Sequence, residues 1–237
     1  MNFKIFILFV LVCLTSCTKP DYDIVVVGGG ASGIVSAVQS SRMGSKTLLI
    51  EETDWLGGML TSAGVSAMDG NYKMPSGFLG EFRDSLVSRY GSLESLKTGW
   101  VSNIMFEPSV GNEILKNIAN KEKNLTIVYN SNVKQVLRKD KKWQLSFNSD
   151  KSIMLVSAKI LIDATELGDI VYKLNLPHSI GMDSRETYNE KIAPIKSNRI
   201  IQDLTYVMIL KDYEKDVTIT EPLDYNRNEF LCSYDSK

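Results

Sequence analysis

The sequence predicts an α/β fold whose first element is a buried parallel strand. Three neighbouring segments carry this prediction. Residues 21–27 are apolar, rich in β-branched side chains, and end in a glycine cluster, which is typical of a strand covered on both faces. Residues 31–43 place apolar side chains at helical spacing before Gly44, and residues 46–51 form a second apolar run. Strand, helix and strand within about thirty residues predict a βαβ unit.

The rest of the chain continues the alternation of helices and strands. Helices are predicted over residues 77–90 and 108–122. Strands are predicted over residues 125–129, 132–138, 143–148, 153–157, 159–163 and 204–210. We expect 125–129 and 159–163 to join the first two strands in a parallel sheet. The stretch 133–157, with a turn near Lys141, is expected to form a small antiparallel meander inserted between helix and strand.

The glycine cluster contains the spacing G-x-G-x-x-G at Gly28, Gly30 and Gly33. Gly28 allows a sharp turn from strand to helix, Gly30 lets a pyrophosphate approach the backbone, and Gly33 lets the helix pack closely on the strand. Ala31 and Ser32 open the helix, whose free N–H groups and positive dipole end favour an anion. The motif therefore predicts a Rossmann-type dinucleotide site, and the alternative is a glycine-rich turn in an unrelated α/β fold.

An acidic residue stands where such a site needs one. Glu51 ends the second strand, about 20 residues after the glycines, where an acid accepts hydrogen bonds from an adenosine ribose. A carboxylate there repels a 2′-phosphate, which disfavours NADP. The glycine motif and Glu51 leave FAD and NAD open as ligands.

Two further segments resemble the FAD-dependent oxidoreductase family. Residues 47–61 are similar to the part of that family in which a ribose-binding acid is followed by a loop that closes over the cofactor; Gly57, Gly58 and Met59 match that loop. Residues 162–169 are similar to its later strand end, with Ala164 and Thr165 in the matching positions and Glu166 where the family pattern has glycine. The resemblance implies that FAD is the cofactor.

The resemblance carries two more expectations. Val133 falls where related flavoproteins contact adenine through main-chain groups, and the alternative is an ordinary core valine. Members of the family are two-domain flavoproteins, usually longer than these 237 residues, with a closing FAD-binding segment near the C-terminus. We expect this chain to be truncated or a short variant, with a FAD-binding domain over residues 18–177 and the start of a substrate domain over residues 178–237.

The first residues predict export. One lysine precedes an apolar run of about ten residues, a signal-peptide pattern that is too short for a typical membrane-spanning helix. Residues 14–17 resemble a bacterial lipobox, in which Cys17 is acylated and becomes the mature N-terminus. We therefore expect residues 1–17 to be a lipoprotein signal and Cys17 to be a membrane anchor, so that the exported protein is periplasmic or held at a membrane of the cell envelope. The alternatives are a buried first strand or an export signal with an unrelated cysteine.

Composition narrows the partners. The formal net charge of −1 gives no basic footprint for nucleic acid. The single histidine, His178, and three cysteines without a CxxC pair argue against a metal site. We expect a small-molecule substrate. Ser62, in the loop 57–76 that should face the flavin, is a candidate contact, and Arg83, early in the next helix, is a candidate for binding an anionic group of the substrate. We name no catalytic residue because a flavin carries its own redox chemistry.

Three functions remain open from the sequence. The first is an FAD-dependent oxidoreductase acting on an unidentified organic substrate. The second is an NAD-dependent dehydrogenase, against which the loop at Gly57 and Gly58 speaks. The third is a non-catalytic, lipid-anchored nucleotide-binding protein.

Overall fold

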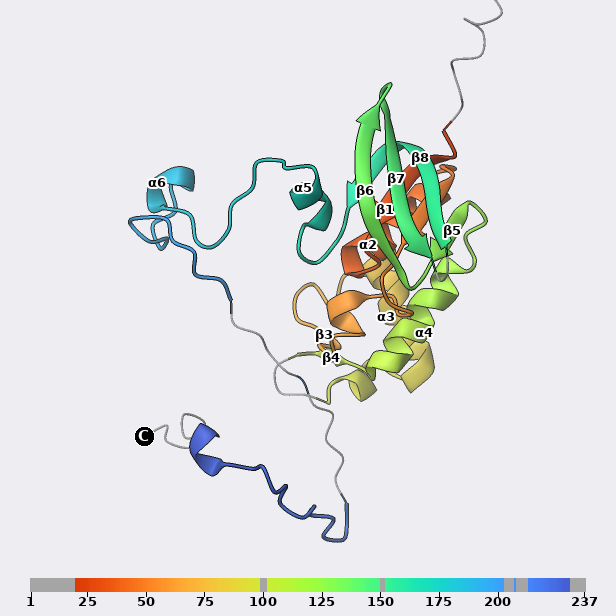
Figure 1. The fold of residues 1–237 in the computed structure, drawn as a ribbon. Coiled ribbons are helices and arrows are strands. Elements are labelled where there is room, and N and C mark those ends of the chain that lie inside the picture. Colours follow the sequence, from red (N-terminus) through yellow and green to blue (C-terminus); the bar gives the residue numbers. More distant parts are fainter. Residues whose placement is uncertain (1–19, 99–101, 150–151, 203–206, 208–212, 231–237) are drawn as a thin grey trace, which may run out of the picture. The chain divides into compact units, whose positions relative to one another are not determined.

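The computed structural model describes residues 20–98, 102–149, 152–202, 207 and 213–230. The chain divides into two compact units, Met1–Val207 and Met208–Lys237. The described residues of the second unit include one short 3-10 helix, η3 (Arg227–Phe230). All strands that the structure describes belong to the first unit (Figure 1). The predicted boundary between residues 177 and 178 remains a prediction.

Four strands of the first unit run parallel. They are β1 (Tyr22–Val27), β2 (Thr47–Ile50), β5 (Leu125–Val128) and the second half of β8 (Ser152–Asp163). β1 lies between β2 and β8, with Val27 opposite both Ile50 and Asp163, so three strand ends reach the same edge of the sheet. The predicted parallel sheet is confirmed, with the order β5-β2-β1-β8.

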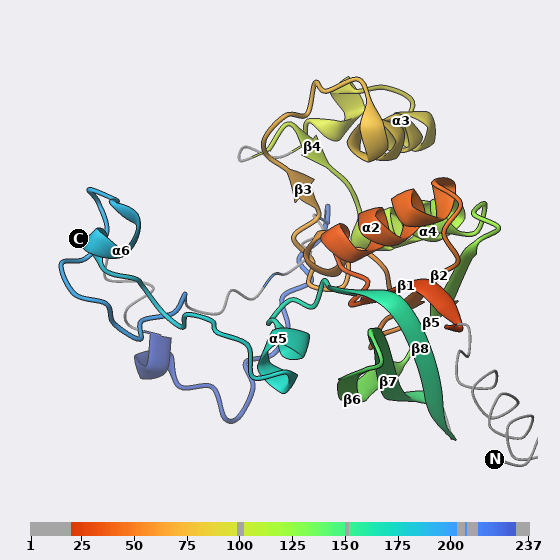
Figure 2. The same ribbon diagram turned by 90° about the horizontal axis from the view of Figure 1, so that it is seen from above.

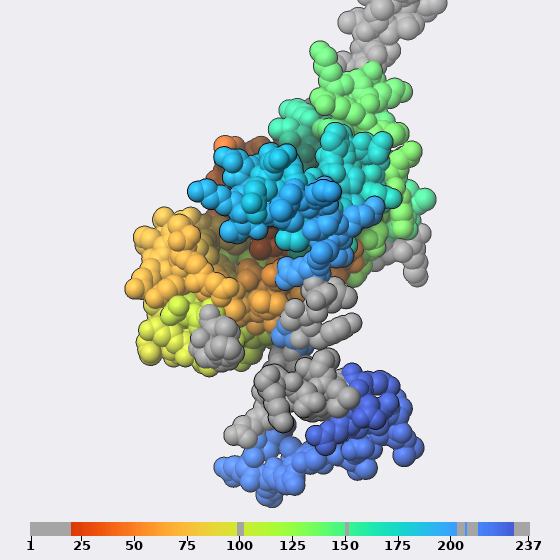
Figure 3. Space-filling model, turned by 90° about the vertical axis from the view of Figure 1, so that its left-hand side faces the viewer, coloured from red at the N-terminus to blue at the C-terminus, as the bar shows by residue number. Residues whose placement is uncertain are grey.

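The predicted antiparallel meander is also confirmed, with one correction. β6 (Ser131–Lys139) and β7 (Lys142–Ser149) form a hairpin whose turn at Asp140 and Lys141 has φ angles of 50° and 64°. The end of this hairpin projects from the rest of the unit (Figures 1 and 3). The sequence predicts separate strands over 153–157 and 159–163, whereas the structure has the single strand β8, because neither glycine nor proline interrupts these residues.

The sheet is covered on both faces, as Figure 2 shows. The helices α2 (Ala31–Arg42) and α4 (Pro108–Ala119) lie on one face, where Val26 and Leu49 pack against Ile34, Val38 and Ile118. The meander covers the other face, where Val25 and Ile50 meet Val133, Leu145 and Phe147. Alternate residues of the same strand therefore serve two cores, which explains why these strands are apolar throughout.

Short elements connect these layers. The glycine-rich stretch 53–76 contains the 3-10 helix η1 (Gly58–Leu60) and the strand β3 (Ala67–Met68), which pairs with β4 (Ile104–Met105). The predicted helix α3 (Gly77–Tyr90) follows and ends at Gly91, and η2 (Glu94–Leu96) comes after it. The helices α5 (Asp169–Lys173) and α6 (Arg185–Tyr188) were not predicted, because five and four residues are too few for a helical pattern.

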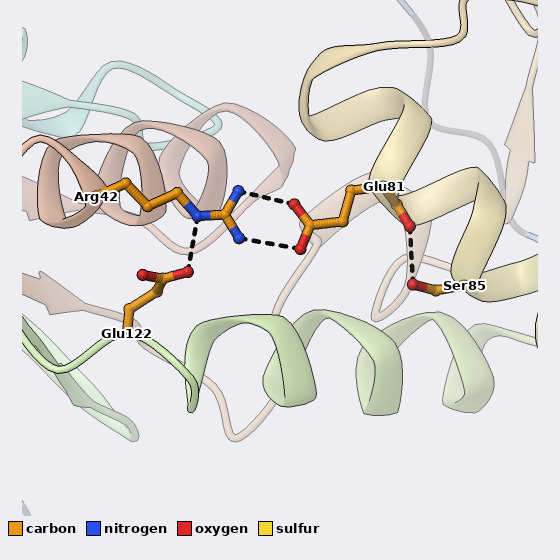
Figure 4. A network of polar contacts seen from close by, with 4 residues as sticks. All are labelled: Arg42, Glu81, Ser85 and Glu122. Carbon is orange, nitrogen blue, oxygen red and sulfur yellow. Dashed lines mark hydrogen bonds and ion pairs between the residues drawn. The ribbon is translucent and has the colours of Figure 1, made fainter.

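One ion-pair network joins three helical segments (Figure 4). Arg42, at the end of α2, donates to both carboxylate oxygens of Glu81 on α3, at 2.7 and 3.0 Å. Its Nε donates to Glu122, just after α4, at 2.7 Å. These bonds raise the pKa of Arg42 above its ordinary value and lower the pKa of Glu81. The network ties α3, which follows the glycine-rich stretch, to the helix of the glycine motif.

Some sequence predictions fall outside this description. Cys17 with its leader, and all but Val207 of the strand predicted over residues 204–210, lie outside the described residues. Among the residues that are described, none of the helices is long and apolar enough to cross a membrane.

Candidate cofactor-binding site

A cavity of about 320 Å³ opens at the carboxyl ends of β1, β2 and β8. Ligands of open α/β sheets bind at this edge, where loops and helix N-termini converge. The cavity is lined by Val27, Gly28, Gly30, Ile50, Glu51, Glu52, Thr53, Gly58, Ser62, Ser131, Asn132, Val133, Ala164, Thr165, Glu166, Leu167, Asp169, Ile170 and Lys173.

The glycine motif forms the turn from β1 into α2. Gly28 has a φ of +94°, and a Cβ there would lie 2.5 Å from the carbonyl oxygen of Ala164. Gly33 is buried against the carbonyl oxygen of Gly28, which leaves no room for a side chain. Gly30 caps α2 without a side-chain bond, and the first turn of the helix holds no acid. The N-terminus of α2 therefore carries no capping side chain or acid of its own that would compete with an anion.

Glu51 lies at the end of β2 and is only 7% exposed. Its Oε2 accepts a hydrogen bond from the backbone N–H of Gly29 at 2.5 Å, and its Oε1 accepts from the N–H and Oγ1 of Thr53 at 2.9 and 2.7 Å. A carboxylate has about four acceptor positions, so Glu51 retains capacity for a ribose hydroxyl. The structure shows a second role that the sequence did not reveal: Glu51 holds the glycine turn against β2.

The charge of Glu51 reaches a neighbouring side chain. Burial raises the pKa of the Tyr129 hydroxyl, and the carboxylate of Glu51 raises this pKa further. The ring of Tyr129 also lies 5.1 Å beneath the Lys116 ammonium group. Tyr129 therefore stays protonated at neutral pH.

The loop at Gly57 and Gly58 is bonded directly to the glycine motif. The N–H of Gly57 donates to the carbonyl oxygen of Gly29 at 2.8 Å, and Gly57 forms a bridge with Gly30. On its other side the N–H of Leu56 donates to Asn112 of α4 at 2.9 Å. Gly57 and Gly58 have φ angles of 110° and 53°, which favour glycine. The two loops together form one wall of the cavity.

Another wall follows β8. The carboxylate of Asp163 accepts hydrogen bonds from the N–H and hydroxyl of Thr165 and from the N–H of Val171. The hydroxyl of Thr165 in turn accepts from the N–H of Asp169 at 2.8 Å. These bonds fold residues 163–169 into a turn that places Ala164 against Gly28 and begins α5.

The cavity brings together part of the predicted set. Gly28, Gly30, Glu51, Gly58, Val133, Ala164 and Thr165 line it. Gly33 and Gly57 are not in the lining, but they contact the glycine turn through the carbonyl oxygens of Gly28 and Gly29. Ala31 and Ser32 are exposed in the first turn of α2, and Met59 is 57% exposed; all three lie outside the lining. Their roles as cofactor ligands remain predictions.

The residues considered for substrate lie in different surroundings. Ser62 lines the cavity. Arg83 instead pairs with Asp84 and donates to the carbonyl oxygen of Met74, so it holds the segment before α3. His178 is exposed and its Nδ1 lies 2.8 Å from the carbonyl oxygen of Leu176.

Several lining residues were missed by sequence reasoning. Ser131 and Asn132 begin β6, next to Val133, and Asp169 and Lys173 lie on α5. A signal existed for the first two, since they immediately precede a residue expected to contact adenine. None existed for Lys173, because the five-residue helix that carries it has no detectable pattern.

The fold and the cavity together define a nucleotide-binding α/β protein of the Rossmann type. A family model described as "FAD dependent oxidoreductase" matches residues 23–233. The chain therefore belongs to the FAD-dependent oxidoreductase family, and the resemblance seen in its motifs is confirmed. FAD, the predicted cofactor, is confirmed with it.

Individual relatives are distant or match in part. The tRNA uridine 5-carboxymethylaminomethyl modification enzyme MnmG of Treponema pallidum (strain Nichols) is 36% identical over 76 residues, which are 30% of this chain and 12% of that protein. Among solved structures, a flavoprotein/dehydrogenase from Cytophaga hutchinsonii is 16% identical with a TM-score of 0.51, over 67% of this chain and 43% of the other. The aromatic hydroxylase CabE from angucycline biosynthesis is 11% identical with a TM-score of 0.50, over 68% and 35%. These structures share the fold, and the chain spans less than half of each relative.

The residues present fit the nucleotide half of FAD. Gly30 and Gly58 face each other so closely that a Cβ on Gly58 would lie 3.0 Å from the Cα of Gly30, which leaves a cradle of bare backbone at the helix N-terminus. The carboxylate-bearing residue Glu51 lines the same cavity. In the part of the chain that the structure describes, no group of three or more His, Cys, Asp or Glu side chains is placed to hold a metal ion.

Proposed function

We propose that this chain is an FAD-dependent oxidoreductase, or the FAD-binding part of one, acting on a small organic molecule. One observation carries the proposal: the glycine turn, Glu51 and the loop at Gly58 line the same cavity. The turn and Glu51 alone are equally compatible with NAD. Gly57 and Gly58 add a second backbone wall that is bonded to the first, which favours the flavin nucleotide over an NAD-dependent dehydrogenase.

Different groups of the site bind different parts of FAD. FAD supplies the redox chemistry when it is bound. The N-terminus of α2 and the bare backbone of Gly30 and Gly58 receive the pyrophosphate, and the carboxylate of Glu51 accepts hydrogen bonds from the ribose hydroxyls. Val133, on the first part of β6, offers main-chain groups to the adenine. In this proposal the described residues bind the adenosine end of FAD, and the substrate binds beyond them.

The first experiment tests cofactor binding by the full chain. The protein is mixed with FAD, freed of excess and examined by visible absorption. We expect retained flavin with shifted bands. A folded protein that retains no flavin would contradict the proposal that this chain by itself forms a working site, and would favour a non-catalytic role.

Two glycine variants make the test specific. Gly30→Ala adds a methyl group in the cradle, where its carbon would meet Glu166 at 2.9 Å, and we expect FAD affinity to fall at least about tenfold because the pyrophosphate loses its close approach. Gly70→Ala is the matched control, since a Cβ there meets nothing within 4 Å. Equal affinities of the two variants would contradict the assigned cradle.

We further propose that Cys17 is lipidated and anchors the protein at the cell envelope. The support is the apolar run and the lipobox-like residues 14–17. Expression of the natural chain in bacteria supplied with labelled palmitate should label the protein, and Cys17→Ser should abolish the label and release the protein from the membrane fraction. Label retained by the Cys17→Ser variant would contradict the anchor.

A further inference from the structure

The cavity is lined by more negative than positive side chains. Glu51, Glu52, Glu166 and Asp169 contribute four carboxylates, and Lys173 is the only lysine or arginine in the lining that the structure describes. A pyrophosphate brings further negative charge. Like charges at close range repel each other, so a carboxylate placed where the pyrophosphate binds would oppose its binding.

Glu166 is the carboxylate placed at the cradle itself. Its Oε1 lies 2.9 Å from the position of a Cβ on Gly30, and closer still to that of a Cβ on Gly58. The oxygen therefore lies beside the backbone of both Gly30 and Gly58, in the space that the pyrophosphate must enter. The other acids differ from it: Glu51 is buried and bonded to the backbone, and neither Glu52 nor Asp169 is among the nearest neighbours of a Cβ position on either glycine.

The carboxylate of Glu166 is free to leave this position. The residue is exposed, and among the hydrogen bonds and ion pairs of the described residues none involves its side chain. Its backbone, in contrast, lies in the turn that Asp163 and Thr165 fix. A rotation about side-chain bonds alone moves the charge out of the cradle.

We propose that Glu166 is a displaceable anionic occupant of the pyrophosphate cradle, which lowers the affinity of the chain for FAD and must turn outward when the cofactor binds. This inference rests on the proposed FAD function. It predicts that the penalty applies to ligands that carry a pyrophosphate and is absent for ligands without phosphate. The apparent affinity for FAD is the intrinsic affinity multiplied by the fraction of molecules in which the cradle is open.

The test measures dissociation constants with the full chain and three variants. Glu166→Gln keeps the shape and removes the charge, and Glu166→Gly removes both. Glu52→Gln is the matched control, because it makes the same change of charge at another lining residue away from the cradle. FAD binding is followed by quenching of flavin fluorescence, and ADP and adenosine binding by calorimetry.

We expect Glu166→Gln to bind FAD and ADP about tenfold more tightly than the wild type, with adenosine unchanged, since a unit charge a few ångströms from a phosphate at a partly exposed site costs about this much. Glu166→Gly should bind at least as tightly as Glu166→Gln. The ratio of wild-type to Glu166→Gln dissociation constants should fall as salt rises from about 0.02 to 0.5 M, because screening weakens the repulsion. Glu52→Gln should change FAD affinity less than about threefold.

The two proposals fail in different ways. FAD binding that is equal in the wild type and Glu166→Gln, or weaker in the variant, would overturn the role of Glu166 and leave the FAD function intact. An equal gain for adenosine and ADP would also overturn it, because the effect would not concern phosphate. Failure of all four proteins to bind FAD or ADP would overturn the proposed function together with this inference.

Discussion

Arg42 offers the sharpest test of how the helical layer is held together. Replacement by Met retains most of the apolar stem and removes the guanidinium, which pairs with Glu81 through two bonds and with Glu122 through one (Figure 4). We expect the Arg42→Met variant to fold and to be less stable than the wild type, because α3 loses its charged link to α2.

The magnitude follows from the exposure of the three side chains. Arg42 and Glu81 are each 33% exposed and Glu122 is 15% exposed, so solvent screens the pairs in part. Exposed ion pairs contribute about 0.2–1 kcal/mol each, and forked arginine pairs lie at the upper end. The whole network is therefore worth about 1–2 kcal/mol, which lowers the melting temperature by roughly 3–6 °C.

Acid should abolish the difference. The hydrogen bonds from Arg42 hold the pKa of Glu81 below its ordinary value of 4.5. A group with a lowered pKa in the folded state contributes its full stability above its unfolded pKa and loses it as pH falls through the folded value. The difference in melting temperature between wild type and Arg42→Met should thus be complete at neutral pH and shrink below pH 4.5.

Thermal melts by circular dichroism at several pH values provide the assay. Lys97→Met is the control, since Lys97 pairs with Glu94 three residues away at the surface, and we expect its melting temperature to equal that of the wild type. A difference between wild type and Arg42→Met that is the same under strongly acidic conditions as at neutral pH would show that packing, and not charge, accounts for the effect and would refute this reasoning.

Three further predictions concern the site. Glu51→Gln places an amide beside the N–H donors of Gly29 and Thr53, so it should destabilise the fold by about 1–3 kcal/mol and weaken FAD binding, as melts and flavin titration would show; an unchanged melting temperature would contradict it. Gly33→Ala should cost about 1–3 kcal/mol despite the better helix propensity of alanine, because its Cβ would overlap the carbonyl oxygen of Gly28; a variant as stable as the wild type would mean that the turn can move. Asn112→Ala removes the acceptor of the Leu56 N–H, and hydrogen exchange should become faster at Leu56 with little change in β1; uniform change throughout would contradict a local role.

Much of the parallel layer could be predicted from the sequence. The strands around residues 22–27, 47–50 and 125–128 are largely apolar because both faces are covered, and this pattern is local and readable. The glycine motif was equally readable, since Gly28 and Gly33 are required by a positive φ and by backbone contact. In both cases the physical constraint falls on neighbouring residues of the chain.

The remainder of the site depends on contacts between distant segments. The hydrogen bond from Leu56 to Asn112 spans 56 residues, and nothing near Asn112 announces it. Glu166 could be recognised as a departure from the family pattern, while its position between Gly30 and Gly58 required three separate loops to be placed together. Lys173 could not be recognised as a lining residue, because α5 is held by hydrogen bonds that its backbone N–H groups donate to Asp163 and Thr165, and not by a helical pattern in its own sequence.

The continuity of β8 has a consequence for how the molecule opens. Ala158 is paired with Tyr22 of β1 on one side and with Trp143 of β7 on the other, so a single fully buried residue belongs to both layers. Local unfolding of the meander therefore disturbs β8, the strand that pairs with β1. Loss of the parallel sheet in turn removes one of the two partners of β8. The two layers should exchange their amide hydrogens with solvent as one cooperative unit. The wall of the cavity formed by residues 131–133 should then be protected from exchange as strongly as the glycine turn.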